Sequence, residues 1–477
     1  MSKEGKTGEA KKPDIIIGLE VHAELATKTK LFCSCPRVGS EEPNTRTCPV
    51  CLGHPGSKPV LNKKALEYAM RLALATGCSI APELVFSRKS YFYPDMSKNF
   101  QISQHEMPLG EKGKVRLSSG KDIKLTRIHM EEDPAALIHP SGMGSSNFVL
   151  VDYNRSGNPL IEIVTEPDMH GPEEARDFMK QLLTVLRYLK IFDIDSCVLK
   201  ADANISIKES GYTRVEVKNI TGFKEIERAL VYEVERHKAR LKEGKTIASD
   251  TRAWDADKGM SRSMRLKESE EDYGYIFEPD LARITLGKGF VEKVKADIPE
   301  LAHDKAKRYV KDFGIKKEDS LIISAQLELA ELYEKVAEKI DPVLAAKWLR
   351  RELARVMNYN NLDFSDLQID ESHLIELLSM IEKKEITDKV GQKILEKLME
   401  EPFDVREHVE KNGLKTAKDS GSLEKICKKT VDENQKVVED YKSGNDKSFN
   451  FLVGQVMRET KGTADPKDVR EKIKRLL

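Results

Sequence analysis

One short segment near the N-terminus has the residue types and spacing of metal ligands. In GLEVHAEL, Glu20, His22 and Glu24 alternate with apolar residues, so an extended strand places all three on one face. Two carboxylates and an imidazole are unfavourable in an apolar core and well suited to hold a divalent cation. We therefore predict that this strand contributes to a metal centre.

Four cysteines follow with the spacing of a structural zinc site. They form the pattern C-x-C-x12-C-x2-C and are Cys33, Cys35, Cys48 and Cys51. Four thiolates fill the tetrahedral coordination of Zn²⁺ and leave no open position, so the predicted ion is structural. The alternative is four unrelated buried thiols. The remaining cysteines are isolated and predicted to be small core residues; they are Cys78, Cys197 and Cys427.

Two later segments offer carboxylates that would complete the first centre. LTRIHMEED contains Glu131 and PLIEIVTEPD contains Glu162, and both segments have the alternation of strands. If these strands neighbour the GLEVHAEL strand, Glu20, Glu131 and Glu162 converge with His22 around one cation. Ligation by several oxygens and a single nitrogen favours Mg²⁺. The alternative is a solvated acidic face of a sheet.

Cations interleaved with aromatic residues form a third cluster, SRKSYFYPDMSKNFQISQHEMPL (87–109). Its Lys89 and Lys98 are candidates to hold phosphate groups, while neighbouring rings can stack on a base. The turn VDYNRSGNPL adds Asn154 and Arg155. The alternatives are an ordinary loop and, for Arg155, an ion pair with a nearby acid.

The composition describes a folded protein of several domains. A chain of 477 residues is too long for one core, and its mean hydropathy is −0.51. No apolar run approaches the roughly 20 residues that span a membrane, and from the polar N-terminus we expect no secretory signal. Few cysteines, four of them in metal-like spacing, suit a reducing compartment, so we expect a cytoplasmic protein without a membrane partner. The common nucleotide-binding and hydrolase motifs, including the P-loop and G-x-G-x-x-G, are absent from the sequence.

Hydrophobic periodicity divides the chain into four parts. Residues 1–13 form a polar tail predicted to be disordered, and 14–295 mix strands with helices in an α+β domain whose sheet is largely antiparallel. Residues 296–409 and 410–477 show helical periodicity only, with a linker predicted at 412–422. We expect the last part to carry a basic surface, formed by Lys425, Lys428, Lys429, Arg458, Lys461, Lys467, Arg470, Lys472, Lys474 and Arg475. Acids are interspersed among them, so the alternative is a solvated helical face.

These segments together resemble the B subunits of tRNA-dependent aspartyl/glutamyl-tRNA amidotransferases (the GatB family). The resemblance is carried, in the family's order, by GLEVHAEL, NTRTCPVCLGHPGSKPVLN, SRKSYFYPDMSKNFQISQ, HMEEDPA, VDYNRSGNPLIEIVTEPD, VEVKNI and FLVGQVMRETKGTADP. It implies a cradle-like N-terminal domain with a zinc knuckle, a helical middle domain and a helical tail that binds tRNA. It also implies a heterotrimer with an amidase A subunit and a small C subunit.

The resemblance implies a reaction as well. The B subunit uses ATP to phosphorylate the side-chain carboxylate of a misacylated tRNA, and ammonia released from glutamine by the A subunit then forms the amide. Mg²⁺ is expected at Glu20, His22, Glu131 and Glu162, and Zn²⁺ at the four cysteines, although some members lack all four. Lys89, Lys98, Asn154 and Arg155 are expected near the phosphates or the tRNA end.

One segment departs from the family pattern. The family usually has DYRYFPEPDL where this chain has DYGYIFEPDL (272–281), which we interpret as an archaeal variant. Alternatives to the amidotransferase are a non-catalytic tRNA-binding scaffold, a metal-dependent nuclease or phosphatase, and the B-like subunit of the archaeal glutamine-specific enzyme. The residues leave open whether Asp-tRNA(Asn), Glu-tRNA(Gln) or both are amidated.

Overall fold

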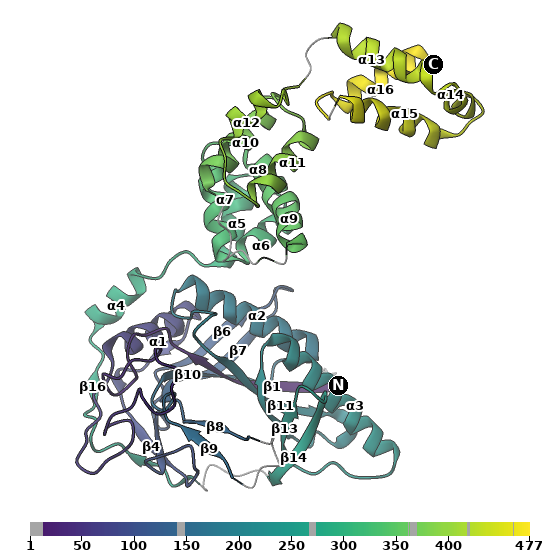
Figure 1. Cartoon of the computed structure of the whole chain (residues 1–477). Coiled ribbons are helices and arrows are strands. Elements are labelled where there is room, and N and C mark those ends of the chain that lie inside the picture. Colours follow the sequence, from purple (N-terminus) through teal and green to yellow (C-terminus); the bar gives the residue numbers. More distant parts are fainter. Residues whose placement is uncertain are drawn as a thin grey trace, which may run out of the picture. The chain divides into compact units, whose positions relative to one another are not determined.

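The computed structural model describes residues 13–140, 148–266, 273–360, 362, 370–416, 420–460 and 462–477. The chain forms two compact units, Met1–Leu301 and Ala302–Leu477, which we describe separately (Figure 1). Residues 1–12 of the predicted disordered tail and 417–419 of the predicted linker lie outside the described residues. The domain boundaries predicted at 296 and 410 stay predictions.

A nine-stranded sheet is the centre of the first unit. Its order is β14-β13-β12-β11-β1-β10-β7-β6-β2, and every neighbouring pair is antiparallel except β12–β13. The strands are β1 (Ile15–Glu24), β2 (Ser79–Ile80), β6 (Gly110–Arg116), β7 (Asp122–Glu132), β10 (Pro159–Thr165), β11 (Leu199–Ile207), β12 (Val215–Thr221), β13 (Asp250–Asp255) and β14 (Met260–Leu266). The predicted α+β class with a largely antiparallel sheet is confirmed.

Three helices pack on one face of this sheet: α1 (Lys63–Ala75), α2 (Pro172–Tyr188) and α3 (Phe223–Lys242). Figure 1 shows α1 and α2 along one side of the sheet, with the β8–β9 hairpin on the other. The local sequence sets two of the helix starts, because the Asn62 side chain caps α1 and Pro172 opens α2. On β1, Ile17, Leu19 and Val21 are fully buried beneath the helices, so the alternate residues face the other side.

Short strands complete the first unit. One small sheet joins β4 (Ser87–Ser90), β5 (Phe100–Ser103) and β15 (Ile276–Phe277). Two more pairs are β3 (Glu83–Leu84) with β16 (Ile284–Thr285), and β8 (Ala136–Ile138) with β9 (Leu150–Asp152). A 3-10 turn, η1 (Lys208–Ser210), follows β11, and α4 (Lys288–Ala296) packs against α1. The pairing of β15 with β4 brings the DYGYIFEPDL segment onto the SRKSY segment.

The second unit is helical throughout its described residues. Its elements are α5 (Ala302–Asp312), α6 (Lys317–Ser324), α7 (Leu327–Ala337), α8 (Pro342–Lys347), the π-helical segment η3 (Trp348–Leu353), α9 (Ala354–Tyr359), α10 (Glu371–Glu382), α11 (Asp388–Leu398), α12 (Val405–Lys411), α13 (Ser420–Glu433), α14 (Gln435–Lys442), α15 (Asp446–Glu459) and α16 (Pro466–Leu476). Two hydrophobic clusters hold it together, one within 309–409 and one within 423–473. The helical periodicity predicted for 296–409 and 410–477 agrees with the described helices of this unit, whose apolar residues form the two clusters.

Among the described residues we find no helix that is both long enough and apolar enough to cross a membrane. The cytoplasmic location stays a prediction.

Candidate functional site

The strand order brings the predicted metal ligands together. β10 lies between β1 and β7, and its Glu162 is directly opposite His22 on one side and His129 on the other. Residues directly opposite in a ladder have side chains on the same face, about 5 Å apart. On β7, Glu131 is directly opposite Leu160 of β10, so it lies diagonally across from Glu162 on the same face. The three strands are therefore neighbours, which was the condition for a shared site.

His22, Glu131 and Glu162 form a compact group. The Nε2 atom of His22 lies 3.5 Å from Glu131 Oε1 and 3.7 Å from Glu162 Oε2. The candidate ligand atoms are all within 4.8 Å of one another. Only 4% of Glu131 and 9% of Glu162 is exposed, which argues against a solvated acidic face. Two buried carboxylate oxygens beside an imidazole nitrogen are a donor set that fits a divalent cation.

His129 is a further member that our sequence reasoning did not assign to the centre. Its Nε2 lies 3.1 Å from Glu162 Oε2 and 4.0 Å from Glu131 Oε2, and the residue is buried. The signal was present in the sequence, because alternation along β7 puts His129 and Glu131 on one face. Contact with both carboxylates makes His129 a group that orients them.

Glu20, the fourth predicted ligand, lies beside the group and outside its closest cluster. It is half-buried on the same face of β1 and accepts a hydrogen bond from Asn204 Nδ2 at 3.0 Å. Burial, followed by the charge of Glu162, raises the pKa of its carboxyl. The structure therefore brings three of the four predicted magnesium ligands together.

Within the group of His22, Glu131 and Glu162, the imidazole and the carboxylates stabilise each other's charged forms. Burial disfavours an imidazolium at His22, yet the hydrogen bond and charge of Glu162, with the charge of Glu131, raise its pKa to about 10. Burial likewise disfavours the carboxylate of Glu162, but His129 and His22 hold its pKa well below the ordinary value. The two carboxylates thus require a nearby positive charge, which the protein supplies through imidazolium and which a metal ion also supplies.

The four predicted phosphate-binding residues have different surroundings. Lys98 forms an ion pair with Glu132, and Lys89 Nζ lies 4.6 Å from the centroid of the Tyr273 ring. Arg155 Nε lies 3.3 Å from Asp133 Oδ2. Arg155 also donates hydrogen bonds to the carbonyls of Pro134 and Ala135.

Asn154 holds the cysteine loop. Its Oδ1 accepts from the Arg46 amide and its Nδ2 donates to the Glu42 carbonyl, both at 2.7 Å. Both polar atoms of the Asn154 side chain therefore bond to backbone in the loop between the cysteine pairs.

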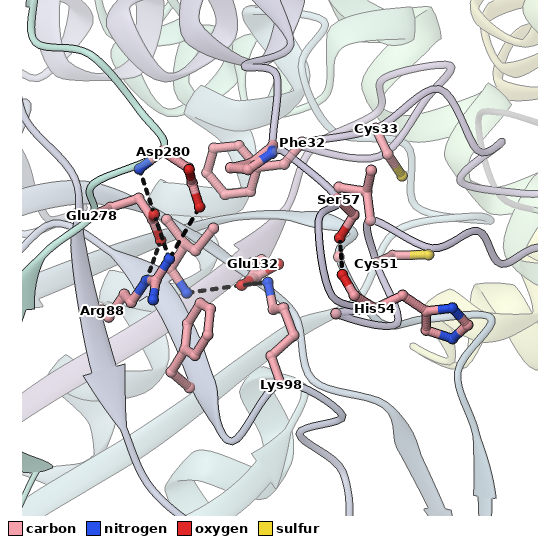
Figure 2. A pocket seen from close by; sticks show the side chains of 16 residues that line it. Phe32, Cys33, Cys51, His54, Ser57, Arg88, Lys98, Glu132, Glu278 and Asp280 are labelled. Atoms are coloured by element: carbon pink, nitrogen blue, oxygen red, sulfur yellow. Dashed lines mark hydrogen bonds and ion pairs between the residues drawn. The ribbon is translucent and has the colours of Figure 1, made fainter.

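A small pocket lies between the cysteine loop and the β4–β5 hairpin (Figure 2). Its volume is about 180 Å³. Figure 2 shows Arg88 in ion pairs with Glu278 and Asp280 on one wall, and Lys98 in an ion pair with Glu132 on another. Neighbouring residues of a strand point to opposite faces, so Glu132 faces this pocket while Glu131 faces the metal group.

The segment that departs from the family pattern contributes to this pocket. Glu278 is 4% exposed and accepts from Arg88 Nε at 2.7 Å and Nη2 at 2.8 Å. Tyr273 contacts the Tyr91 ring edge-on at 6.2 Å. Asp272, which opens the segment, lies outside the described residues. Sequence reasoning missed Glu278, because its partner is 190 positions away along the chain.

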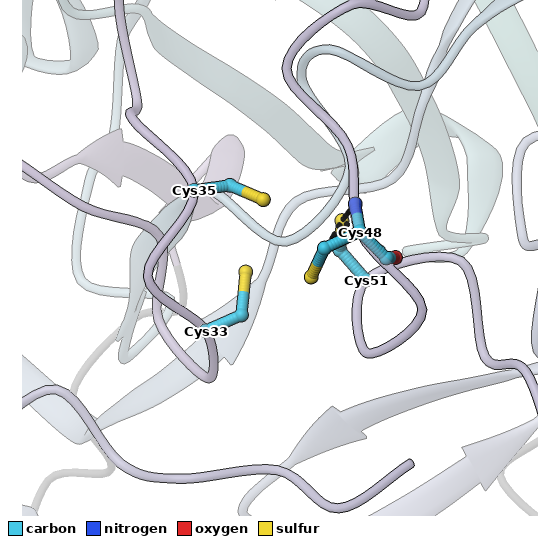
Figure 3. A group of neighbouring side chains, drawn as sticks. All are labelled: Cys33, Cys35, Cys48 and Cys51. Carbon is cyan, nitrogen blue, oxygen red and sulfur yellow. Dashed lines mark hydrogen bonds between the residues drawn. The ribbon is translucent and has the colours of Figure 1, made fainter.

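The four cysteines converge as predicted (Figure 3). Their sulfur atoms lie within 4.8 Å of one another. The Cys48 amide lies 3.2 Å from Cys51 Sγ and donates to it. A hydrogen bond from Cys33, helped by the charge of Lys30, lowers the pKa of Cys51 to about 5 although burial opposes it. Convergence of all four sulfurs argues against unrelated thiols and fits a tetrahedral Zn²⁺. The three isolated cysteines are buried, as predicted.

A fully buried lysine adjoins this cluster. Lys30 has no exposed surface, and its Nζ lies 3.8 Å from Cys51 Sγ and 3.3 Å from the Tyr153 carbonyl oxygen. Its position lets it offset the negative charge of the thiolates.

Two parts of the chain match known protein families. Residues 15–292 match the GatB/GatE catalytic domain, and residues 331–477 match the GatB domain. Together these segments include both metal-like groups and most of the helical unit.

Curated relatives align with nearly the whole chain. A protein of Thermoanaerobacter pseudethanolicus is 41% identical over 465 residues, which are 95% of this chain and 97% of the relative. One of Carboxydothermus hydrogenoformans is 39% identical over 468 residues (96% and 97%), and one of Brevibacillus brevis is 40% identical over 476 residues (98% and 99%). Each is named as the B subunit of an aspartyl/glutamyl-tRNA(Asn/Gln) amidotransferase. These relatives are bacterial, so our interpretation of an archaeal variant is not borne out.

Proposed function

The chain belongs to the GatB family of aspartyl/glutamyl-tRNA amidotransferase B subunits, and we propose that it activates a misacylated tRNA for amidation. In this proposal ATP phosphorylates the side-chain carboxylate of Asp-tRNA(Asn), Glu-tRNA(Gln) or both. Ammonia from a partner glutaminase then replaces the phosphate and forms Asn-tRNA or Gln-tRNA. The observation that carries the proposal is the buried group of His22, Glu131 and Glu162, with its ligand atoms within 4.8 Å.

Chemistry explains why ATP is needed. A carboxylate oxygen is a poor leaving group, so ammonia does not displace it directly. In the first step the carboxylate oxygen attacks the γ-phosphorus, the bond to the bridging oxygen breaks, and ADP leaves with the electron pair. In the second step the nitrogen of ammonia attacks the acyl carbon, the carbon–oxygen bond to the phosphate breaks, and inorganic phosphate leaves with the electron pair. The nitrogen gives up one proton, which the departing phosphate can accept. The first step depends on positioning and charge neutralisation, which suits a face rich in ionic groups.

We propose that His22, Glu131 and Glu162 hold Mg²⁺, with Glu20 next to them. When bound, Mg²⁺ supplies charge neutralisation for the phosphoryl oxygens. His129 fixes the Glu162 carboxylate through the 3.1 Å contact. We assign Lys89, Lys98 and Arg155 to the phosphates or the tRNA end. Asn154 holds the cysteine loop beside them.

We propose that the four cysteines hold a structural Zn²⁺. All four donors are sulfur and converge in a loop, which fits a closed tetrahedral site. The loop forms one wall of the 180 Å³ pocket, through Cys33 and Cys51 among others. The ion's role in this proposal is to keep that wall in place.

The relatives are named as one subunit of an enzyme, which suggests a complex of several chains. We propose an amidase A subunit, which hydrolyses glutamine, and a small C subunit as partners. We also propose that the helical tail binds tRNA through its basic residues; α16 carries Lys467, Arg470, Lys474 and Arg475. Lys461, another predicted contact, lies outside the described residues.

The test is amidation by the complex of this chain with its proposed A and C partners. Asp-tRNA and Glu-tRNA are supplied separately with glutamine, ATP and Mg²⁺, and both ADP and the amide on the tRNA are measured. We expect both products in the wild type and neither with Glu131→Gln. If tRNA binds but no ADP forms in the wild type, the protein is a scaffold. If the protein cleaves tRNA that carries no amino acid, the protein is a nuclease.

A further inference from the structure

Most cations near the metal group have carboxylate partners. Lys218 Nζ lies 3.0 Å from Asp202 and 3.3 Å from Glu216, and Arg155 is paired with Asp133. Lys200, also close to the group, differs from these cations. Among the residues that the structure describes, we find no ion pair and no side-chain hydrogen bond for it.

The sheet places Lys200 beside the metal group. β11 is the neighbour of β1, and Lys200 is directly opposite His22 in the ladder. Burial alternates along β11, with Ala201 and Ala203 buried and Lys200 half-buried on the other face. Directly opposite residues share a face at about 5 Å between Cβ atoms, so Lys200 is on the face of His22 and Glu162.

Among the described residues, the ammonium of Lys200 has nearby carboxylates but no carboxylate within ion-pair distance. Burial and then the positive charge of Arg155 lower the pKa of Lys200, and the charges of Asp133, Glu24 and Asp202 offset this only in part. A partly buried charge is unfavourable without a hydrogen-bonded partner. An anion bound against this face would supply that partner.

We infer that Lys200 binds the phosphoryl group that is transferred from ATP to the substrate carboxylate. The inference rests on the proposed function and adds a residue to it. During transfer the bond from the carboxylate oxygen to phosphorus forms, the bond to the ADP oxygen breaks, and Lys200 neither gains nor loses a proton. The ammonium of Lys200, on β11, donates hydrogen bonds to the phosphoryl oxygens. His22, Glu131 and Glu162 lie on β1, β7 and β10, which follow β11 in the sheet.

The test compares Lys200→Met with Lys200→Arg in the full complex with its A and C partners. Lys208→Met is the matched control, because Lys208 follows the same strand, is exposed, and pairs with Asp14 at 3.6 Å. ADP formation from ATP is measured with Asp-tRNA and with Glu-tRNA, together with the KM for ATP, the affinity for tRNA and the melting temperature.

We expect Lys200→Met to lower kcat for ADP formation about 100-fold, the usual effect of removing one charge-stabilising donor. Arginine at this position should restore activity to within about tenfold. Affinity for tRNA and the melting temperature should not change, because Lys200 has no ion pair or side-chain hydrogen bond to lose among the described residues. Full activity of Lys200→Met would overturn the inference, and so would a matching loss of activity in Lys208→Met.

Two further outcomes are informative. If Lys200→Met loses its fold, the lysine is structural and the inference is wrong. If the wild type forms neither ADP nor amide, the proposed function itself fails. If the wild type and Lys200→Met are equally active, by contrast, the proposed function stands and only the role of Lys200 is wrong.

Discussion

Replacing Arg37 should destabilise the first unit strongly. Arg37 is 4% exposed and lies between the two cysteine pairs. Its Nη1 lies 3.3 Å from Glu24 Oε1 and 2.6 Å from the Ser196 carbonyl, Nη2 lies 2.8 Å from Ser196 Oγ, and Nε donates to the Thr27 carbonyl at 3.1 Å. This side chain therefore joins the cysteine loop to β1, which carries His22, and to the turn before β11.

The magnitude follows from what Arg37→Met leaves behind. Glu24 is 3% exposed and would stay buried without its cation. Breaking a buried ion pair from one side costs about 3–5 kcal/mol. Asn158 Nδ2 still donates to Glu24 at 2.6 Å, and the Val198 amide at 3.3 Å, so we expect the lower end, about 3 kcal/mol. For a unit spanning Met1–Leu301, with an unfolding entropy of about 2.1 cal/mol/K per residue, that corresponds to roughly 5 °C in melting temperature.

The assay is urea and thermal unfolding of the whole chain, followed by a probe in the first unit such as Trp254 fluorescence. The matched control is the double variant Arg37→Met with Glu24→Gln, which removes the uncompensated charge. It should be more stable than Arg37→Met alone. A loss below about 1 kcal/mol in the single variant, or a double variant less stable than the single, would refute the reasoning.

Three other predictions concern charge, zinc and tRNA. The pKa of His22 is raised to about 10 in the metal-free protein, so its stabilising charge is fully present below pH about 6.5 and is lost as pH rises through 10. Metal-free protein should therefore lose stability over that range, and His22→Asn should flatten the profile of melting temperature against pH. Lys30→Met should weaken zinc binding at least about tenfold, measured by chelator competition. The control Lys28→Met changes an exposed lysine and should keep the zinc affinity within about twofold of the wild type. Equal zinc affinities of the two variants would show that Lys30 does not support the centre. Removing the residues after 410 should weaken tRNA binding and leave ATP chemistry possible; unchanged tRNA affinity in filter binding would contradict a role for the tail.

Much of the candidate site was predictable from local patterns. Alternation along GLEVHAEL and LTRIHMEED assigned Glu20, His22 and Glu131 to single strand faces, because side chains in a strand alternate whatever the strand pairs with. The cysteine spacing predicted the four-sulfur group for a similar reason, since a loop with pairs at C-x-C and C-x2-C folds back on itself within a few residues. The helical character of the second unit followed from periodicity alone.

Which of these residues meet was a matter for the tertiary structure. The sequence by itself determined the residue types, the faces of the strands and the local loop, because these depend on neighbours along the chain. Only strand order and register decided that Glu162 lies between His22 and His129, that Glu20 turns to Asn204, and that Glu278 pairs with Arg88. The same holds for Lys200, which short-range patterns do not distinguish from other strand lysines. Its position opposite His22, without a partner of its own among the described residues, comes from contacts between segments far apart in sequence, whose pairing is settled by packing of the whole sheet.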